Sequence, residues 1–260
     1  MIDMFSEIRS SWGFKSLILH SAFSDIKTRY QKTILGPFWV TFGSLIFSIA
    51  LGVVWSTIFK IEIKTYLPYL LSGFLIWSFI SNTIIESTSS LISGEFHLKN
   101  TKITILFFTS TCILRNLIIF FHNLIAFFLI AVVMDVNINF SIFFFPIFLI
   151  IISLNLYWIS IIVSIICLRY RDLQQLITLT LQVLILITPI LWPIDVIPES
   201  KAIFFELNPL YHLVTLLRDT LLGNTYKLNS LLFCTILLPI GFIFAFLLLK
   251  AKKSRILFWY

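Results

Sequence analysis

Charged residues are scarce in this sequence. Only 12% of the 260 residues are charged, whereas 59% are apolar, and the mean hydropathy is +1.00. A soluble domain has about 25% charged and roughly 45–50% apolar residues. So large an apolar share cannot be buried in one globular core of this length, and lipid must act as the solvent for much of it. The composition therefore predicts an integral membrane protein rather than a soluble enzyme.

Cysteine is also rare. Cys112, Cys167 and Cys234 are odd in number, widely spaced, and each lies in or beside an apolar run. This pattern argues against a disulfide framework and against a metal site, and it predicts small buried apolar residues. A cleavable signal peptide is not expected either, because Asp3 and Glu7 occupy the N-terminus where a signal has basic and then apolar residues.

Motifs for catalysis and nucleotide binding are absent from the sequence. It contains no G-x-x-x-x-G-K-[ST] phosphate loop, no G-x-S-x-G nucleophile elbow and no His or Cys cluster with metal spacing. We expect no ATP hydrolysis, cofactor or metal in this chain, so transport is favoured over chemistry. The net charge is +7. Because the basic residues flank apolar spans and form no separate basic face, they indicate membrane topology rather than nucleic-acid binding.

Six apolar stretches have about the length that a helix needs to cross the hydrocarbon at roughly 1.5 Å per residue. They cover approximately 34–59, 66–92, 103–134, 140–168, 176–192 and 228–249. We therefore predict an all-α membrane protein with six transmembrane helices, all within one transmembrane domain at 34–250.

The segment before the first span, residues 1–33, is amphipathic. Leu19, Phe23, Ile26 and Tyr30 recur at helical spacing, with charged residues between them. Such a helix lies in the interface, with its apolar side among the lipid headgroups and its charges in water.

Two later segments also differ from the spans. In 193–227, prolines and charged residues interrupt the apolar runs Ile203 to Leu207 and Leu210 to Leu222. Two short re-entrant helices at the outer membrane edge fit this pattern better than a free loop. Residues 251–260 are expected to form a basic cytoplasmic tail.

The basic residues predict the orientation. Six spans place both termini on one side, and the larger set of basic residues lies on that side: Arg9, Lys15, Lys27, Arg29, Lys32, Lys99, Lys102, Arg169, Arg171, Lys250, Lys252, Lys253 and Arg255. The smaller set lies on the other side: Lys60, Lys64, Lys201, Arg218 and Lys227. Because basic residues stay in the cytoplasm, both termini are predicted to be cytoplasmic.

Four local patterns occur in a fixed order along the chain. The first is the amphipathic helix from Asp25 that turns at Gly36-Pro37 into the first span. The others are Arg115-Asn116 with His122-Asn123, Leu168-Arg-Tyr-Arg-Asp-Leu-Gln174 continuing to Thr188-Pro-Ile-Leu-Trp-Pro193, and Asn208-Pro-Leu-Tyr-His212 continuing to Arg218 and Leu221-Leu-Gly223. Together they resemble the membrane subunit of ABC-2-type transporters over about residues 20 to 250. The details are most similar to the polysaccharide-export branch, and within it to O-antigen permeases.

The resemblance implies a homodimer forming one channel in the bacterial inner membrane, with two copies of a separate ATPase subunit that binds ATP and Mg. The implied cargo is a polysaccharide carried on undecaprenyl diphosphate. The segment Ser93 to Lys102 then corresponds to a coupling helix that docks on the ATPase. Its contact residues are expected to be Glu95, Phe96, His97, Leu98 and Lys99. The hairpin 193–227 corresponds to an outer gate containing Pro193, Asn208, Pro209, His212 and Arg218.

Further candidate residues follow from this interpretation. The cytoplasmic entrance for the lipid diphosphate would contain Arg29, Tyr30 and Lys32. Substrate-path candidates are Trp39, Phe42, Arg115 and His122.

Simpler interpretations of these residues stay open. Arg115 and Glu86, which are ionisable groups within spans, could form a structural ion pair. His122 and Asn123 could serve interhelical hydrogen bonds, the aromatic residues could be interfacial anchors, and the 19–30 helix could only anchor the chain at the membrane surface.

Alternative functions also stay open. One is an ABC-2 permease for another cargo, such as a drug, a lipid, a capsule or teichoic acid. A membrane transferase would need a polar pair at a membrane face, and only Asp195 with Glu199, or Arg171 with Asp172, could serve. A stand-alone secondary carrier would work without any ATPase.

Overall fold

The computed structural model describes residues 13–36, 38–101, 103–198, 204–256 and 258–259, and the secondary structure in these ranges is helical, without strands. The first part of the predicted interfacial segment, residues 1–12, lies outside the described residues. Its remainder forms helix α2, Lys15–Tyr30. The all-α prediction is therefore confirmed for the described chain.

Five helical segments in the described ranges are long and apolar enough to cross a membrane. They are α3 (Phe38–Phe59), α4 (Ile63–Ser93), α6 (Ile105–Val133), the short helix η1 (Phe140–Phe144) continuing into α7 (Phe145–Arg169), and α11 (Leu228–Ile256). They correspond to the expected spans except the one at 176–192. The chain is thus a multi-pass membrane protein.

The expected span at 176–192 is not confirmed as a full crossing. Helix α8 covers Leu173–Ile187, which is 15 residues, or about 22 Å at 1.5 Å per residue, short of the roughly 30 Å hydrocarbon. Its last residue is followed by Thr188, which has extended dihedral angles (φ −77°, ψ 138°). Pro189 explains this end, because a proline disfavours helical geometry in the residue before it.

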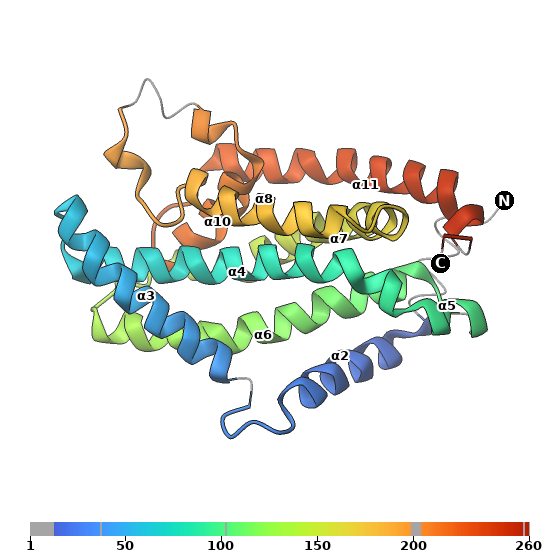
Figure 1. The fold of residues 1–260 in the computed structure, drawn as a ribbon. Helices are drawn as coiled ribbons and strands as arrows, with labels where there is room; N and C mark the ends of the chain where they lie inside the picture. Colours follow the sequence, from blue (N-terminus) through green and yellow to red (C-terminus); the bar gives the residue numbers. More distant parts are fainter. Residues whose placement is uncertain (1–12, 37, 102, 199–203, 257, 260) are drawn as a thin grey trace.

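Helix α4 lies in the middle of the bundle, beside α3, α6, α7, α8 and α10 (Pro209–Leu221) (Figure 1). It is the most deeply buried of the five long helices, and α3 and α11 are the least buried. Helix α11 covers the outside of α7. The packing therefore surrounds α4 with protein and leaves α3 and α11 at the periphery.

Helix α3 packs against the bundle through small residues and exposes large ones. Its buried positions follow one another at helical spacing: Thr41, Ser44, Ser48, Gly52 and Ser56. Phe42, Phe47 and Ile58 are exposed. Small side chains allow close helix–helix approach in lipid, where apolar residues gain nothing by leaving the membrane for the protein interior.

The start of α2 and the end of α11 lie at the same end of the bundle as the short helix α5, Glu95–Asn100 (Figure 1). Helix α11 continues to Ile256, so the first part of the expected tail at 251–260 is helical. Ile256 is buried at this end, and the ring of Trp259 lies 5.7 Å from the Arg169 guanidinium carbon. We refer to this end as the α5 end.

The segment 193–227 contains helix α10, which is buried along most of its length, but the expected re-entrant helix pair is not confirmed. The other expected helix overlaps residues 199–203, which lie outside the described part, although 204–206 are helical. The re-entrant placement of α10 at the outer membrane edge stays a prediction.

The prediction that the three cysteines are buried is confirmed. Cys112, Cys167 and Cys234 are free thiols that are all buried in the bundle. The three side chains fill space as small apolar groups.

Candidate functional site

A polar pocket of about 330 Å³ opens near the α5 end, between α2, α4, α5 and α6. Its charged lining comes from Asp25 and Arg29 of α2, Glu86 of α4 and Arg115 of α6. Hydroxyl groups of Ser89, Ser90 and Ser93 on α4 form a second part of the wall, to which His97 of α5 and Cys112 of α6 also contribute. We call this cavity the polar pocket.

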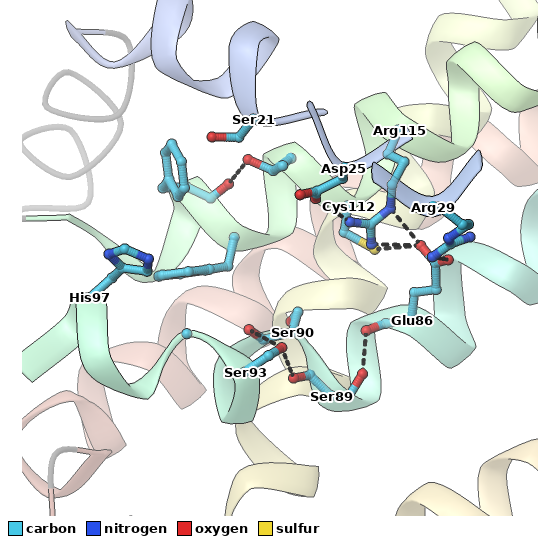
Figure 2. A pocket seen from close by; sticks show the side chains of 14 residues that line it. Ser21, Asp25, Arg29, Glu86, Ser89, Ser90, Ser93, His97, Cys112 and Arg115 are labelled. Carbon is cyan, nitrogen blue, oxygen red and sulfur yellow. Dashed lines mark hydrogen bonds and ion pairs between the residues drawn. The ribbon is translucent and has the colours of Figure 1, made fainter. Parts of the chain in front are cut away.

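The carboxylate of Glu86 is at the centre of the charged lining (Figure 2). Its Oε2 accepts from Arg115 Nη2 at 2.7 Å, from Arg115 Nε at 3.0 Å and from Asn116 Nδ2 at 2.7 Å. Its Oε1 accepts from Arg29 Nη2 at 2.8 Å. Arg115 Nη1 also donates to Asp25 Oδ2 at 2.5 Å. We call these four charged residues the charge network.

The charge network balances two guanidinium groups against two carboxylates. An ionised side chain within a span costs several kcal/mol unless it is paired or wet. Glu86 and Arg115 are largely buried, and both carboxylate oxygens of Glu86 accept charge-assisted hydrogen bonds. The structural ion pair that the sequence left open is therefore present.

The charge network also attaches α2 to the bundle. Ala22 and Ile26 are the buried residues of this helix, and they lie against α6 together with the paired Asp25 and Arg29. Because Asp25 and Arg29 are four residues apart, they lie on one face of the helix. Leu19 and Phe23, which belong to the predicted apolar side, are exposed, as a side that faces lipid headgroups would be.

The three predicted entrance residues have different surroundings in the structure. Arg29 lines the polar pocket, whereas Lys32 is exposed just beyond the end of α2 and Tyr30 is half-buried. The backbone oxygen of Tyr30 accepts from the Thr33 hydroxyl at 2.8 Å. The structure therefore places Arg29 in an ion pair and leaves Lys32 toward the solvent.

Helix α5 presents an exposed aromatic ring. Phe96 is 70% exposed, while Leu98 packs against the apolar cluster at this end of the bundle. Lys99 Nζ lies 2.6 Å from Glu95 Oε1 across one helical turn. His97 faces the polar pocket. A helix held by Leu98 with Phe96 facing outward has the form of a docking element.

The predicted substrate-path residues are not gathered at one place. Arg115 belongs to the charge network, but Trp39, Phe42 and His122 do not line the polar pocket. Trp39 and Phe42 are exposed on α3, and His122 Nδ1 lies 2.8 Å from the backbone oxygen of Ile118 in its own helix. An interhelical hydrogen bond is made by the neighbouring Asn123, whose Oδ1 accepts from Thr41 Oγ1 at 3.0 Å.

At the end of the bundle opposite α5, Arg218 contacts the segment that follows α8. Its side chain is 3% exposed. Nη1 donates to the backbone oxygen of Pro189 at 2.8 Å, and the guanidinium carbon lies 4.1 Å from the Tyr69 ring centroid. Tyr69 and Tyr66 donate their hydroxyls to backbone oxygens of the same segment, at Trp192 and Leu191 respectively. This end of α8 is therefore fixed by side chains of α4 and α10.

Asn208 and His212 complete that arrangement. Asn208 caps α10 by accepting from the amide of Leu210 at 3.0 Å, and it donates to the Thr188 hydroxyl at 2.9 Å. Pro209 is the first residue of α10, where its missing N–H costs little. His212 Nδ1 lies 3.0 Å from the Ser230 hydroxyl, and His212 Nε2 lies 2.6 Å from the backbone oxygen of Glu206.

Two further observations concern the predicted gate residues His212 and Pro193. Burial lowers the pKa of His212, so its imidazole is neutral at pH 7. Pro193, the remaining predicted gate residue, precedes the short helix η2, Ile194–Val196.

Replacing Arg218 with alanine is expected to lower the free energy of unfolding by about 3 kcal/mol, since it removes a charge-assisted hydrogen bond and leaves a cavity beside Tyr69. Thermal unfolding of the detergent-solubilised chain measures the change. Arg171→Ala is the control, because Arg171 is exposed and a surface substitution changes stability by about 0.5 kcal/mol or less. Equal effects of the two substitutions would contradict the structural role of Arg218.

Several residues of these sites were not named as site residues from the sequence. Glu86 was recognised only as an ionisable residue within a span, and Asp25 only as part of a motif. Opposite charges on neighbouring spans were a usable signal for Glu86 and Arg115. Tyr66 and Tyr69 gave no comparable signal, because tyrosines near a span end equally fit an interfacial belt.

The fold and these sites define a polytopic helical membrane protein. The charge network lines a pocket at one end of its bundle, and side chains of α4 and α10 hold the end of the short helix α8 at the other. Residues 18–222 match the ABC-2 type transporter family. This match covers most of the chain, and the chain belongs to that family of transporter permease subunits.

Curated relatives are similar over nearly their whole length. An O-antigen export system permease protein RfbA of Klebsiella pneumoniae is 27% identical over 242 residues, which cover 90% of this chain and 92% of the relative. A second RfbA from the same species is 26% identical over 81% of this chain and 83% of the relative. A Myxococcus xanthus RfbA is 19% identical over 80% and 81%, respectively.

Proposed function

We propose that this chain is the permease subunit of an exporter that moves a lipid-linked polysaccharide of the O-antigen type across the bacterial inner membrane. The observation that carries the proposal is the similarity to an O-antigen export permease over 90% of this chain and 92% of that relative. A similarity that covers most of both chains supports a shared arrangement of spans and connecting segments.

The proposed assembly is a homodimer with two copies of a separate ATPase subunit, which would bind ATP and Mg. This chain has no phosphate loop of its own, so the energy would have to come from such a partner. In this arrangement the α5 end faces the cytoplasm, and α8 together with the segment 188–192 completes a sixth crossing. The excess of basic residues in the segments at the α5 end supports that orientation.

The cargo would be carried on undecaprenyl diphosphate and would enter beside α2. Arg29 and Lys32 are the basic candidates for its diphosphate. Arg29 is already paired with Glu86 at 2.8 Å, so an incoming diphosphate would compete with that carboxylate for the guanidinium. Competition of this kind would weaken one of the two ionic links that hold α2 to the bundle, and it would open the entrance only when the cargo head is present.

Helix α5 would transmit the motion of the ATPase. Phe96 offers an exposed anchor of the kind that dominates protein interfaces. The next residue, His97, lines the polar pocket, and its ring packs edge-on against Phe96 with the ring centroids 5.7 Å apart. A displacement of α5 would therefore reach the pocket wall directly, and the outer hairpin at 193–227 would open for the departing glycan.

Co-expression tests the partner. A tagged copy of this chain should retain a phosphate-loop ATPase encoded beside it through affinity purification, in equal amounts. Phe96→Ala should reduce the retained ATPase at least tenfold, because an exposed aromatic anchor contributes roughly 2 kcal/mol or more to an interface. The matched control is Phe258→Ala, since Phe258 is also exposed, at 86%, but lies outside α5.

An export assay in the same cells tests the cargo. Cells that depend on this chain should display the long polysaccharide on their surface, and Phe96→Ala should abolish that display. An ATPase that is retained equally by both variants would refute the docking role of α5. Cells that keep their surface polysaccharide without this chain would refute the proposed cargo.

A further inference from the structure

A second polar cavity lies at the end of the bundle opposite α5. It has a volume of about 520 Å³, within the range of roughly 300–1,000 Å³ that small-molecule sites occupy. Three connections far apart in the sequence form it: the one before α4, the one after α6 and the one after α10 (Figure 1). We call it the loop pocket, and the polar side chains that line it include Glu62, Lys64, Tyr69, Asp135, Asn137 and Asn224.

The walls of the loop pocket are fixed by close backbone packing. Gly223 has a φ of +72°, and a Cβ atom placed there would lie 2.0 Å from the backbone oxygen of Asn137. The side chain of Asn139 donates to the backbone oxygen of Gly223 at 3.1 Å, and the amide of Asn224 donates to the backbone oxygen of Asp219 at 2.8 Å. Two of the three connections are therefore locked together, so the pocket exists without a ligand.

Several polar side chains that line the loop pocket remain available for hydrogen bonds to a ligand. Within the described part of the chain, the side chains of Glu62, Asn137 and Asn224 make no hydrogen bond. The Lys64 ammonium and the Asp135 carboxylate are 3.9 Å apart, beyond hydrogen-bond distance. A ligand that both donates and accepts hydrogen bonds would satisfy all of these groups.

The charge of the lining restricts what that ligand can be. Two carboxylates, Glu62 and Asp135, face one ammonium group, Lys64, so the pocket repels phosphate and other anions. Amides and carboxylates bind neighbouring hydroxyl groups in pairs, because each offers two polar atoms in one plane. The Tyr69 ring also lines the pocket, with the Arg218 guanidinium carbon 4.1 Å from its centroid. The part of the ring that Arg218 leaves uncovered is an aromatic surface of the kind that packs against sugar C–H groups.

We propose that the loop pocket binds an uncharged sugar unit of a glycan on its way out of the protein. The inference rests on the proposed export function and adds to it a binding subsite and the chemistry of its ligand. Tyr69 connects the subsite to the other end of α8, because its ring contacts Arg218 and its hydroxyl bonds to the backbone of Trp192. A sugar bound in the loop pocket thus touches a side chain that holds the proposed outer gate.

Direct binding to the full chain in lipid nanodiscs tests the subsite. The probes are neutral hexasaccharides of glucose, mannose and galactose, and saturation-transfer NMR measures their binding. At least one should bind, and inorganic diphosphate should not displace it. The double variant Asn137→Ala/Asn224→Ala should weaken binding at least tenfold, whereas the control Asn229→Ala, which alters an exposed residue outside the pocket, should leave it unchanged.

The outcomes separate this inference from the proposed export function. The subsite is wrong if no hexasaccharide binds, or if the double variant binds as the parent chain does, even when cells export their polysaccharide normally. If binding depends on Asn137 and Asn224 but no polysaccharide is exported, the subsite stands and the export proposal fails.

Discussion

Replacing Glu86 with alanine is expected to destabilise the protein more than any other change in the charge network. The substitution leaves Arg115 and Arg29 without their shared carboxylate. Removing one partner of a buried ion pair costs about 3–5 kcal/mol, because the remaining charge stays uncompensated. The unfolding temperature of the solubilised chain should fall by roughly 10 °C, as measured by the loss of the monodisperse peak on size-exclusion chromatography after heating.

Two further variants identify the cause. Asp25→Ala should cost only about 1 kcal/mol, because Asp25 is 46% exposed and exposed pairs contribute little. The double variant Glu86→Ala/Arg115→Ala should be more stable than Glu86→Ala alone, since it removes both charges of the central pair. If Glu86→Ala unfolds at the same temperature as the parent chain, the charge network contributes nothing to stability.

Replacing Gly223 with alanine should have the second largest effect. The residue has a left-handed φ, and the new methyl group would lie 2.0 Å from a backbone oxygen that cannot rotate away. We expect a loss of about 3 kcal/mol or more, combining roughly 1–2 kcal/mol of backbone strain with the displacement of a packed loop. Thermal unfolding of the solubilised chain measures the loss.

Gly36 provides the matched control. Its φ is +56°, close to that of Gly223, but no atom lies within 4 Å of the position that a Cβ would take. Gly36→Ala should therefore show the strain alone, about 1–2 kcal/mol. Equal losses in the two variants would mean that backbone strain accounts for both and that the contact with Asn137 is unimportant.

The long spans could be predicted from sequence because their cause is local. An apolar run longer than about 18 residues has no alternative solvent but lipid or a core. The length of α8 was mispredicted because the apolar run continues through Pro189 to Trp192, whereas the helix ends at Ile187. A hydropathy profile does not detect this break, whereas the restricted backbone geometry of the residue before a proline predicts it.

The sites were less predictable because they depend on tertiary contacts. The sequence allowed an ion pair between Glu86 and Arg115 as one of two interpretations, because a charge within a span needs a compensating partner. That α2 would add Asp25 and Arg29 to the same network could not be derived, because Asp25 is 90 positions from Arg115 and Arg29 is 57 positions from Glu86. Such contacts follow from how α2 packs on α6, which no local pattern encodes.

The burial of all three cysteines has a practical consequence for testing whether two copies of this chain associate. A thiol reagent applied to the folded protein would react little with the native residues. A single new cysteine at an exposed position of α3 or α8 could then carry a spin label on the unaltered native background. Distances between labels on two copies would test the proposed homodimer and, if it forms, map its interface helix by helix.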